Sequence, residues 1–386
     1  MSIRIAIEMF EDARWLGGSI YIENLLSALS ALPQDERPEV AMRFLSDPTT
    51  PLAQRLRAFP VAQTIKGSSR LLARARRLQR AVLRRAPALT RLCPGDRDEV
   101  FFPVFDASLP SRRNLYWIPD FQPLRLPDLF DADERRVRKE AMAAIARTRG
   151  TLLLSSHAAL DDFRTYFPDA TVRPVVWTFC STLVAGSAEQ GQLARARHQL
   201  SEKFLYVANH FWRHKDHATL FEALHLLRQR GLVIPVVCTG LMEDRRAPDH
   251  VPALRRLVEQ WELDEQICFL GLVSRAEQVE LFRMAAAVVQ PSRFEGWSTV
   301  IEDARALGRP VIASDIPVHV EQLADYPSSC IFPVSDPAGL ASALADVWPK
   351  LASGPDLVQE EQAAARLVDR RLERARAFVA LVQSVA

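Results

Sequence analysis

The chain has 386 residues, 48% of them hydrophobic, so its length predicts two domains with sizeable cores. Its formal charge of +2 gives no overall field for nucleic acid, which argues against a nucleic-acid-binding protein. The five cysteines stand singly, without a Cys-x-x-Cys pair, and indicate neither a zinc site nor a disulfide framework. The first eight residues alternate like a strand, and no apolar run approaches the ~18 residues of a spanning helix. These features together predict a cytoplasmic protein.

The first half of the chain alternates short apolar runs with longer polar stretches, as expected for strands separated by helices. A helix is predicted to begin at Gly17-Gly18, and another to run from Asp131 to Arg147. Six strands are expected, over residues 3–7, 40–44, 100–104, 115–118, 151–154 and 172–176.

The second half shows the same alternation more clearly. Six further strands are expected, over residues 204–208, 234–239, 267–270, 287–290, 311–314 and 331–334. Helices are expected between them, over residues 218–229, 252–261, 275–284 and 299–307. Residues 177–202 lose the strand pattern, and we interpret them as the connection between two domains. The last segment, residues 355–386, has one long helical pattern.

Alternating strands and helices, with strands that are apolar throughout, favour parallel sheets covered on both faces. The sequence therefore predicts an α/β protein with two Rossmann-like domains that face each other across a cleft. We place the first domain at residues 1–180, the second at 181–355, and a final helix at 356–386 that packs back on the first domain. Ligands bind beyond the carboxyl ends of the strands in such sheets, so the loops that follow the strands are candidates for the site.

Residues 291–312 are the most informative stretch of the chain. A strand leads into a loop and then a helix, whose first turn presents free backbone N–H groups and the positive end of its dipole. Such a helix start suits a phosphate or diphosphate. Glu295 lies just before the helix, and Glu302 and Asp303 lie inside it. An anion site flanked by carboxylates indicates a ligand with both phosphate and many hydroxyl groups, such as a nucleotide sugar.

This stretch resembles glycosyltransferase family 4, whose members are retaining enzymes with the two-domain GT-B fold. The residues in the register of the family signature are Glu295, Gly296, Ala304, Gly308, Arg309, Pro310 and Val311. Residues 206–217 are similar to the loop that holds a phosphate-binding basic pair, and Gly17-Gly18 and Asp120 follow the first and fourth strands as in the family. The resemblance implies a nucleotide diphosphate sugar as donor and a reaction that needs no metal ion or other cofactor.

The resemblance also implies roles for individual residues. Lys215 would bind the diphosphate, and Glu295 would bind sugar hydroxyls and offset positive charge on the sugar, so these two are the candidate catalytic residues. The other candidates for binding the donor are Gly296, Trp297, Ser298, Thr299, Asn209, His210, Arg213, Gly17 and Gly18. Asp120 would orient the acceptor or the donor sugar. A loop cap at Asp120 and a plain tight turn at Gly17-Gly18 stay open as alternatives.

Two positions of the donor site depart from the family pattern. Asp303 stands where the family has its second signature glutamate, and Glu302 lies one position earlier. Residues one apart on a helix point ~100° apart, so we assign the ribose hydroxyls to Asp303 and keep Glu302 as the alternative. Asn209 stands where the basic pair usually has an arginine, six residues before Lys215, so Arg213 or backbone amides would supply the charge.

A third departure lies after the fourth strand, where many family members have His-Asp and this chain has Pro119-Asp120. The contact of that histidine with the donor sugar is therefore missing or made otherwise. Three histidines crowd residues 210–217, but no carboxylate or cysteine completes a metal geometry there. We expect His210 and Trp212 to shape the donor pocket instead.

Residues 66–91 hold one lysine and eight arginines without an acid. The arginines that share one helical face are Arg70, Arg74, Arg77 and Arg84. Two interpretations stay open. A basic amphipathic helix here would rest on the anionic inner face of the cytoplasmic membrane, close to a lipid-linked acceptor. The alternative is a solvated helix that packs its leucines on the first domain.

From the residues and the resemblance, we expect a retaining glycosyltransferase that moves a hexose to a growing glycan during surface polysaccharide or O-antigen synthesis. Mannose or a related sugar from a GDP donor is the predicted donor, through likeness to polysaccharide mannosyl- and rhamnosyltransferases. Two alternatives remain, namely a sugar-nucleotide hydrolase or epimerase on the same fold, and a non-catalytic subunit that binds the nucleotide sugar. A dehydrogenase is excluded, since no Gly-x-Gly-x-x-Gly follows the first strand.

Overall fold

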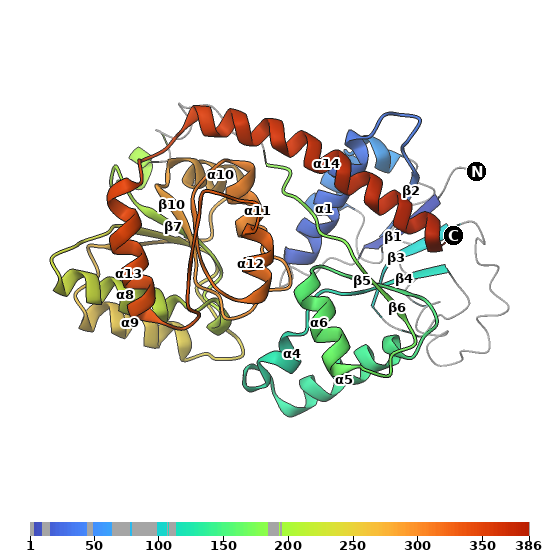
Figure 1. Cartoon of the computed structure of the whole chain (residues 1–386), viewed down its shortest axis with the longest axis horizontal. Coiled ribbons are helices and arrows are strands. Elements are labelled where there is room, and N and C mark those ends of the chain that lie inside the picture. Colours follow the sequence, from blue (N-terminus) through green and yellow to red (C-terminus); the bar gives the residue numbers. More distant parts are fainter. Residues whose placement is uncertain are drawn as a thin grey trace. The chain divides into compact units, whose positions relative to one another are not determined.

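The computed structural model describes residues 4–9, 16–44, 49–63, 78, 99–105, 107, 113–183, 193 and 195–385. Within these ranges, twelve strands form two six-stranded sheets, in the orders β2-β1-β3-β4-β5-β6 and β12-β11-β10-β7-β8-β9 (Figure 1). Every strand pair in both sheets is parallel. The contacts divide the chain into unit 1, residues 1–124, 132–180 and 368–386, and unit 2, residues 125–131 and 181–367.

Unit 1 contains the first sheet. Its strands are β1 (Arg4–Met9), β2 (Glu39–Phe44), β3 (Glu99–Val104), β4 (Arg113–Ile118), β5 (Thr151–Leu154) and β6 (Arg173–Val176). Its helices include α1 (Leu16–Ala31), α2 (Pro51–Arg57), α5 (Ala132–Ala146) and α6 (His157–Tyr166), with the short α4 (Gln122–Arg125) at the boundary of the two units. Residues of β3, β4 and β5 pack with α5 and α6 in a hydrophobic core.

Unit 2 contains the second sheet. Its strands are β7 (Leu205–Ala208), β8 (Val236–Thr239), β9 (Ile267–Gly271), β10 (Ala287–Gln290), β11 (Val311–Ser314) and β12 (Ser329–Phe332). Its helices are α8 (His217–Gln229), α9 (His250–Gln260), α10 (Arg275–Met284), α11 (Thr299–Ala306), α12 (Pro317–Leu323) and α13 (Pro337–Val347), followed by the start of α14 (Leu357–Val385).

The strands of unit 2 are apolar throughout because both faces of the sheet are covered. Successive residues of a strand point to opposite faces, and β7 shows the result. Leu205 and Val207 belong to the core on one face, with residues of α8 and α13. Tyr206 and Ala208 belong to the core on the other face, with residues of α10 and α11. Burial on both faces thus explains the continuous apolar runs from which these strands were predicted.

The last helix, α14, is 29 residues long and ends in unit 1. There, Nε1 of Trp177 donates a hydrogen bond to the carbonyl of Arg374 at 2.8 Å. The ring of Phe378 packs edge-on against Phe102 of β3, with 5.4 Å between ring centroids. These contacts fix the second half of α14 to the core of unit 1.

The predicted fold class is confirmed, and each of the twelve predicted strands is present. The largest shift is in the last strand, β12, which ends at Phe332 rather than at Val334. Pro333 follows directly and has no N–H to donate to a ladder. Residues 66–91 lie outside the described residues, apart from Leu78, so the prediction of a basic helix there stays a prediction. Among the described helices, none combines the length and apolar composition needed to cross a membrane.

Candidate functional site

The predicted site residues of unit 2 follow β7 and β10, and the end of β11 lies beside them. The sheet order places β10 between β7 and β11, so the loops after these strands lie side by side. Asn209, directly after β7, donates from Nδ2 to Oε1 of Gln290, the last residue of β10, at 2.8 Å. Ser314, the last residue of β11, donates from Oγ to the carbonyl of Ser292 at 2.6 Å. These bonds tie the ends of the three strands into one rigid edge.

Lys215 and Glu295 form an ion pair at this edge, with 2.6 Å between Nζ and Oε1. The same Oε1 also accepts hydrogen bonds from Nε2 of Gln290 at 2.8 Å and from Oγ of Ser292 at 2.7 Å. The Lys215 and Glu295 side chains are only 14% and 11% exposed. Within the described part of the chain, Oε2 of Glu295 accepts no hydrogen bond. The two candidate catalytic residues therefore lie together, and one carboxylate oxygen of Glu295 is available to a ligand.

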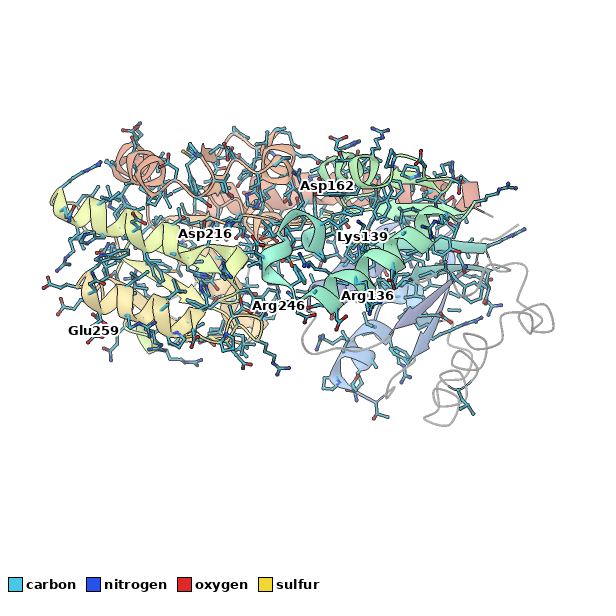
Figure 2. The ribbon with its side chains drawn as sticks, turned by 90° about the horizontal axis from the view of Figure 1, so that it is seen from below. Arg136, Lys139, Asp162, Asp216, Arg246 and Glu259 are labelled. Atoms are coloured by element: carbon cyan, nitrogen blue, oxygen red, sulfur yellow. The ribbon has the colours of Figure 1, made fainter. Side chains whose placement is uncertain are left out.

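The loop that carries Lys215 is held in place by a carboxylate on each side. The backbone N–H of Arg213 donates to Asp244 at 2.8 Å. Asp216, labelled in Figure 2, takes a left-handed conformation with φ of 54° and accepts hydrogen bonds from the hydroxyls of Thr219 and Ser335. Fixing both flanks of Lys215 limits the positions that its ammonium group can take.

The electrostatics of the edge keep Glu295 ionised and its neighbouring histidines neutral. Burial alone would raise the pKa of Glu295, but the ammonium of Lys215 beside it lowers this pKa to about 2. Burial lowers the pKa of His214 to about 3 and that of His319 to about 4. At neutral pH the site therefore holds one fixed carboxylate, one fixed ammonium and two neutral imidazoles.

Helix α11 begins at this edge, with Ser298 as its N-cap. The hydroxyl of Ser298 accepts from the N–H of Ile301 at 3.3 Å. The backbone N–H of Ser298 donates to Oε1 of Gln322 in α12 at 2.9 Å. In this structure the amide of Ser298 is thus engaged within the protein. Gly296, Trp297 and Thr299, the other residues predicted to present amides to the phosphate, are each partly exposed in the same loop and first turn.

Asp303 and Glu302 point to different surroundings on α11. Oδ1 of Asp303 accepts from the hydroxyl of Ser181 at 2.6 Å, and Oδ2 pairs with Arg275 at 2.7 Å. Burial raises the pKa of Asp303, against the opposing effect of Arg275. Glu302 is fully buried and accepts from Nε2 of Gln322 at 3.3 Å. Each acid has a structural partner, and which of the two binds ribose stays a prediction.

Asn209, Arg213 and His210 lie in the loop that lacks the usual arginine six residues before Lys215. Asn209 is buried, and its amide is bonded to Gln290. Arg213 has an exposed side chain. Nδ1 of His210 accepts from the backbone N–H of Leu241 at 2.9 Å, and the His210 ring lies 5.0 Å from that of Trp212. Asn209, at the position that usually carries an arginine, is therefore a neutral link between β7 and β10. The cation that follows it most closely in the sequence is the exposed Arg213.

The predicted residues of the first domain lie in unit 1. Gly17 and Gly18 lie in the first turn of α1, where Gly17 is exposed and Gly18 buried. Asp120 follows β4, and its Oδ1 accepts from the backbone N–H of Gln122 at 3.0 Å, a cap at the start of α4. This hydrogen bond is the one that the loop-cap interpretation expects, and a contact with a sugar stays a prediction. No group of three or more His, Cys, Asp or Glu among the described residues is arranged to hold a metal ion.

Several residues of the edge were not predicted from the sequence. Gln290 and Ser292 organise Glu295, and His319 and Gln322 reach the site from α12. Gly240, which has φ of +130°, lies so close to the loop after β7 that a Cβ would be 2.2 Å from the carbonyl oxygen of Asn209. The sequence signal that could have identified Gln290 is that a polar glutamine ends the apolar run of β10.

The chain is similar to known proteins over part of its length. Residues 192–349 match the model of the family described as glycosyl transferases group 1. The chain is 40% identical over 75 residues, 19% of its length, to the O-antigen chain mannosyltransferase RfbU of Salmonella typhimurium. It is 35% identical over 112 residues, 29% of its length, to a D-inositol 3-phosphate glycosyltransferase of Pseudarthrobacter chlorophenolicus. These matches span only 21% and 26% of the two relatives.

A solved structure extends the likeness to both sheets. Alr3699/HepE from Anabaena, in complex with UDP and glucose, superposes with a TM-score of 0.68 at 15% identity, over 99% of this chain and 100% of that one. An identity this low speaks for the fold alone. The chain thus has the GT-B fold of two Rossmann-like domains, and its residues 192–349 match the model of the glycosyl transferases group 1 family.

Proposed function

We propose that the protein is a retaining glycosyltransferase that moves a hexose from a nucleotide diphosphate sugar to a glycan. The observation that carries the proposal is the buried pair of Lys215 and Glu295 beside the start of α11. When the anomeric bond breaks, negative charge builds on the diphosphate and positive charge on the sugar. Lys215 supplies the cation for the diphosphate, and the free Oε2 of the ionised Glu295 accepts hydrogen bonds from the sugar hydroxyls.

Retention follows from reaction on one face of the sugar. A carboxylate with a pKa of about 2 that is paired with an ammonium is a weak nucleophile, which disfavours a covalent intermediate at Glu295. In the proposed path the bond between the anomeric carbon and the phosphate oxygen breaks, and the acceptor hydroxyl forms its bond on the same face. The proton of that hydroxyl passes to the departing phosphate oxygen. Lys215 performs the charge neutralisation, so the reaction needs no metal ion.

For the donor we propose GDP-mannose or a GDP-linked relative, and for the acceptor a lipid-linked glycan of a surface polysaccharide. The support is the 75-residue likeness to RfbU, an O-antigen chain mannosyltransferase. The structure of Alr3699/HepE, which holds UDP and glucose, makes a uridine nucleotide the main competitor.

Thermal shifts with GDP, UDP, ADP, CDP and TDP test the nucleotide. A ligand raises the melting temperature according to its affinity for the folded state, so GDP is expected to give the largest shift. The shift should shrink in Lys215→Ala if the diphosphate lies where we propose. A larger shift with UDP would overturn the donor proposal, and no shift with any nucleotide would overturn nucleotide binding itself.

Turnover assays separate the enzyme from its alternatives. Transfer from GDP-mannose to a lipid-linked glycan, unchanged by EDTA, is the expected result. Donor hydrolysis without transfer would favour a hydrolase. Nucleotide binding without turnover on any acceptor would favour a non-catalytic binding subunit, for which the neutral Asn209 leaves room.

We also propose that the basic residues 66–91 place the enzyme at the inner face of the cytoplasmic membrane, where a lipid-linked acceptor is found. Flotation on anionic liposomes, compared between the wild type and an Arg74/Arg77/Arg84→Glu variant, tests this. The wild type should float and the variant should not. If both stay in the soluble fraction, the membrane proposal fails.

A further inference from the structure

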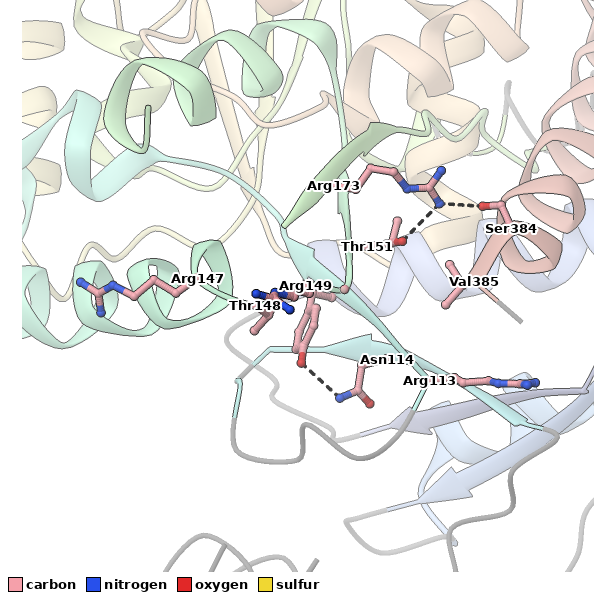
Figure 3. A pocket seen from close by; sticks show the side chains of 11 residues that line it. Arg113, Asn114, Arg147, Thr148, Arg149, Thr151, Arg173, Ser384 and Val385 are labelled. Atoms are coloured by element: carbon pink, nitrogen blue, oxygen red, sulfur yellow. Dashed lines mark hydrogen bonds between the residues drawn. The ribbon is translucent and has the colours of Figure 1, made fainter. Parts of the chain in front are cut away.

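Four arginines are among the residues that line a pocket of about 760 Å³ in unit 1, although the Arg147 side chain points away from the others (Figure 3). Arg113 is the first residue of β4 and Arg173 is the first residue of β6, while Arg147 and Arg149 lie between α5 and β5. Because β4, β5 and β6 are neighbouring parallel strands, the segments that lead into them meet at the amino edge of the sheet. The topology therefore brings four arginines from between residues 113 and 173 to the lining of one pocket.

Within the described residues, no carboxylate neutralises the positive charge of this pocket. No aspartate or glutamate is present among the described residues that line it, and none of the four arginines pairs with a carboxylate in the described ranges. The opposite end of the same sheet differs. Arg4, the first residue of β1, lies 3.0 Å from Glu99 and 3.9 Å from Glu39. Among the described residues, Arg4 of β1 and Arg43 of β2 thus pair with Glu99, whereas no carboxylate pairs with the four arginines of the pocket.

Neutral polar groups complete the pocket and orient one of its cations. Nη2 of Arg173 donates to the hydroxyl of Thr151 at 3.2 Å and to that of Ser384 in α14 at 2.8 Å, as Figure 3 shows. These two bonds fix the guanidinium plane, and its Nε and Nη1 groups donate to no other described residue. Asn114 and Thr151 also line the pocket and are each more than nine-tenths buried. The pocket therefore has a buried polar wall as well as a charged rim.

We propose that this pocket is a second anion site, which binds a molecule carrying a diphosphate or a similar cluster of phosphate groups. A guanidinium matches a phosphate through two parallel hydrogen bonds, and unpaired arginines are the groups that such recognition uses. The volume lies in the range of small-molecule sites and exceeds the needs of one phosphate ion.

The pocket differs in kind from the proposed donor site. Nucleotides bind at the carboxyl edge of sheets of this type, whereas the pocket lies at the amino edge. Its residues all belong to unit 1, and the Lys215–Glu295 edge belongs to unit 2. Its occupant is therefore a further ligand, either a soluble polyphosphate compound or the phosphate headgroup of a lipid.

The test uses the full chain, with pyrophosphate as the probe and calorimetry as the measurement. The variant Arg147→Gln/Arg149→Gln removes two exposed cations of the pocket. The matched control is Arg136→Gln/Arg138→Gln, which removes two exposed arginines of α5 that pair with acids on the same helix. Figure 2 labels Arg136. Because the donor site also binds phosphate groups, each titration is repeated in the Lys215→Ala background.

The pocket variant should lose about tenfold or more in pyrophosphate affinity in both backgrounds, the usual effect of charge-assisted hydrogen bonds. The control should stay within about twofold of its parent, as expected for exposed ion pairs. Equal pyrophosphate affinity in the wild type and the pocket variant, in both backgrounds, would overturn the proposal.

Vesicles separate the two sources of the phosphate. Because residues 66–91 are themselves proposed to bind anionic liposomes, the vesicles are used as competitors of pyrophosphate in the Arg74/Arg77/Arg84→Glu background. Displacement of pocket-bound pyrophosphate by phosphatidylglycerol vesicles, but not by neutral phosphatidylcholine vesicles, would assign the site to a lipid headgroup. Pyrophosphate binding that depends on the pocket and is not displaced by phosphatidylglycerol vesicles would assign it to a soluble ligand.

Discussion

The sheets of the two units both gather charged side chains at one edge, but they treat these charges differently. In unit 2, Lys215 and Glu295 are largely buried and paired. In unit 1, the arginines around the pocket are exposed and share one sign. A buried charge must be paired, because an unpaired one loses its hydration without compensation. An exposed charge keeps its hydration, so it can remain unpaired until a ligand binds.

The difference separates two uses of charge in one fold. The paired edge holds its groups in fixed positions, which suits a reaction that develops opposite charges on donor and leaving group. The unpaired pocket attracts anions over a longer range, and salt should weaken that attraction. Binding of pyrophosphate to the pocket should therefore fall with ionic strength more steeply than binding of a nucleotide to the Lys215–Glu295 edge.

Removing the cation of the paired edge should have the largest effect. Lys215→Ala should lower the rate of transfer by ~10²-fold or more, as for the loss of one transition-state contact. The change also leaves Glu295 without its partner, so the melting temperature is measured alongside. Lys350→Ala, at an exposed lysine of the same unit, is the control and should keep the wild-type rate. A normal rate in folded Lys215→Ala would remove the paired edge from the mechanism.

A substitution at Gly240, directly after β8, should disturb the paired edge. Gly240→Ala would place a Cβ 2.2 Å from the carbonyl oxygen of Asn209, at a backbone φ of +130°. We expect a loss of about 2 kcal/mol or more in unfolding free energy, measured by urea denaturation, together with weaker nucleotide binding. Gly231→Ala is the control, since its φ is +78° but nothing lies within 4 Å of the new Cβ. Equal losses in the two variants would show that the approach to Asn209 is unimportant.

Substitutions of Asp303 and Glu302 in α11 test which of these two acids binds a ligand and which one stabilises the fold. Asp303→Asn should weaken nucleotide binding by about tenfold, the effect of a lost charged hydrogen bond. Glu302→Gln should leave binding almost unchanged, because Glu302 is fully buried against Gln322. Calorimetric titration with the preferred nucleoside diphosphate measures both. The reverse order would move the ribose contact from Asp303 to Glu302.

The buried histidines give unit 2 a pH dependence that the pocket of unit 1, with no histidine in its described lining, does not share. Burial lowers the pKa of His217 and His214 to about 3 and that of His319 to about 4. These folded values lie below the ordinary histidine value of about 6.5, so protonation favours the unfolded chain. Stability is complete above pH 6.5 and decreases as the pH falls, by up to about 1.4 kcal/mol per pH unit for each histidine.

His217→Phe tests this dependence at one position. Both ring nitrogens of His217 are buried without a hydrogen-bond partner among the described residues, and the ring stacks on Phe211 with 4.1 Å between centroids. Phenylalanine keeps the stacking and removes the titrating group, so urea midpoints at pH 7.5 and 5.5 should differ less than in the wild type. An unchanged difference would show that His217 is not the source.

The sequence predicted the strands well because burial on both faces of a sheet requires a continuous apolar run in each strand. β7, for example, is an apolar run whose residues enter two separate cores. The order of the strands leaves no such trace, since strands of about four residues can pair in many ways. That order is what brings Lys215 to Glu295, and the sequence indicated their meeting only through the family resemblance.

Other parts of the charge arrangement could not be predicted from patterns. Helix α12, with only seven residues, was not among the predicted helices, so nothing in the sequence placed His319 and Gln322 at the sheet edge. The arginine pocket was missed for a similar reason. Arg113 and Arg173 each look like an ordinary charged residue at the start of a strand, and only the pairing of β4, β5 and β6 joins them.

The central claim is that the ionised carboxylate of Glu295 stabilises the transferring sugar, and Glu295→Gln tests it most directly. The substitution keeps the size and hydrogen-bonding reach of the side chain but removes its charge. Single-turnover transfer from the preferred donor should fall by ~10²-fold or more, while affinity for the nucleoside diphosphate stays within about threefold. A near-normal rate of transfer in a folded Glu295→Gln variant would contradict the account.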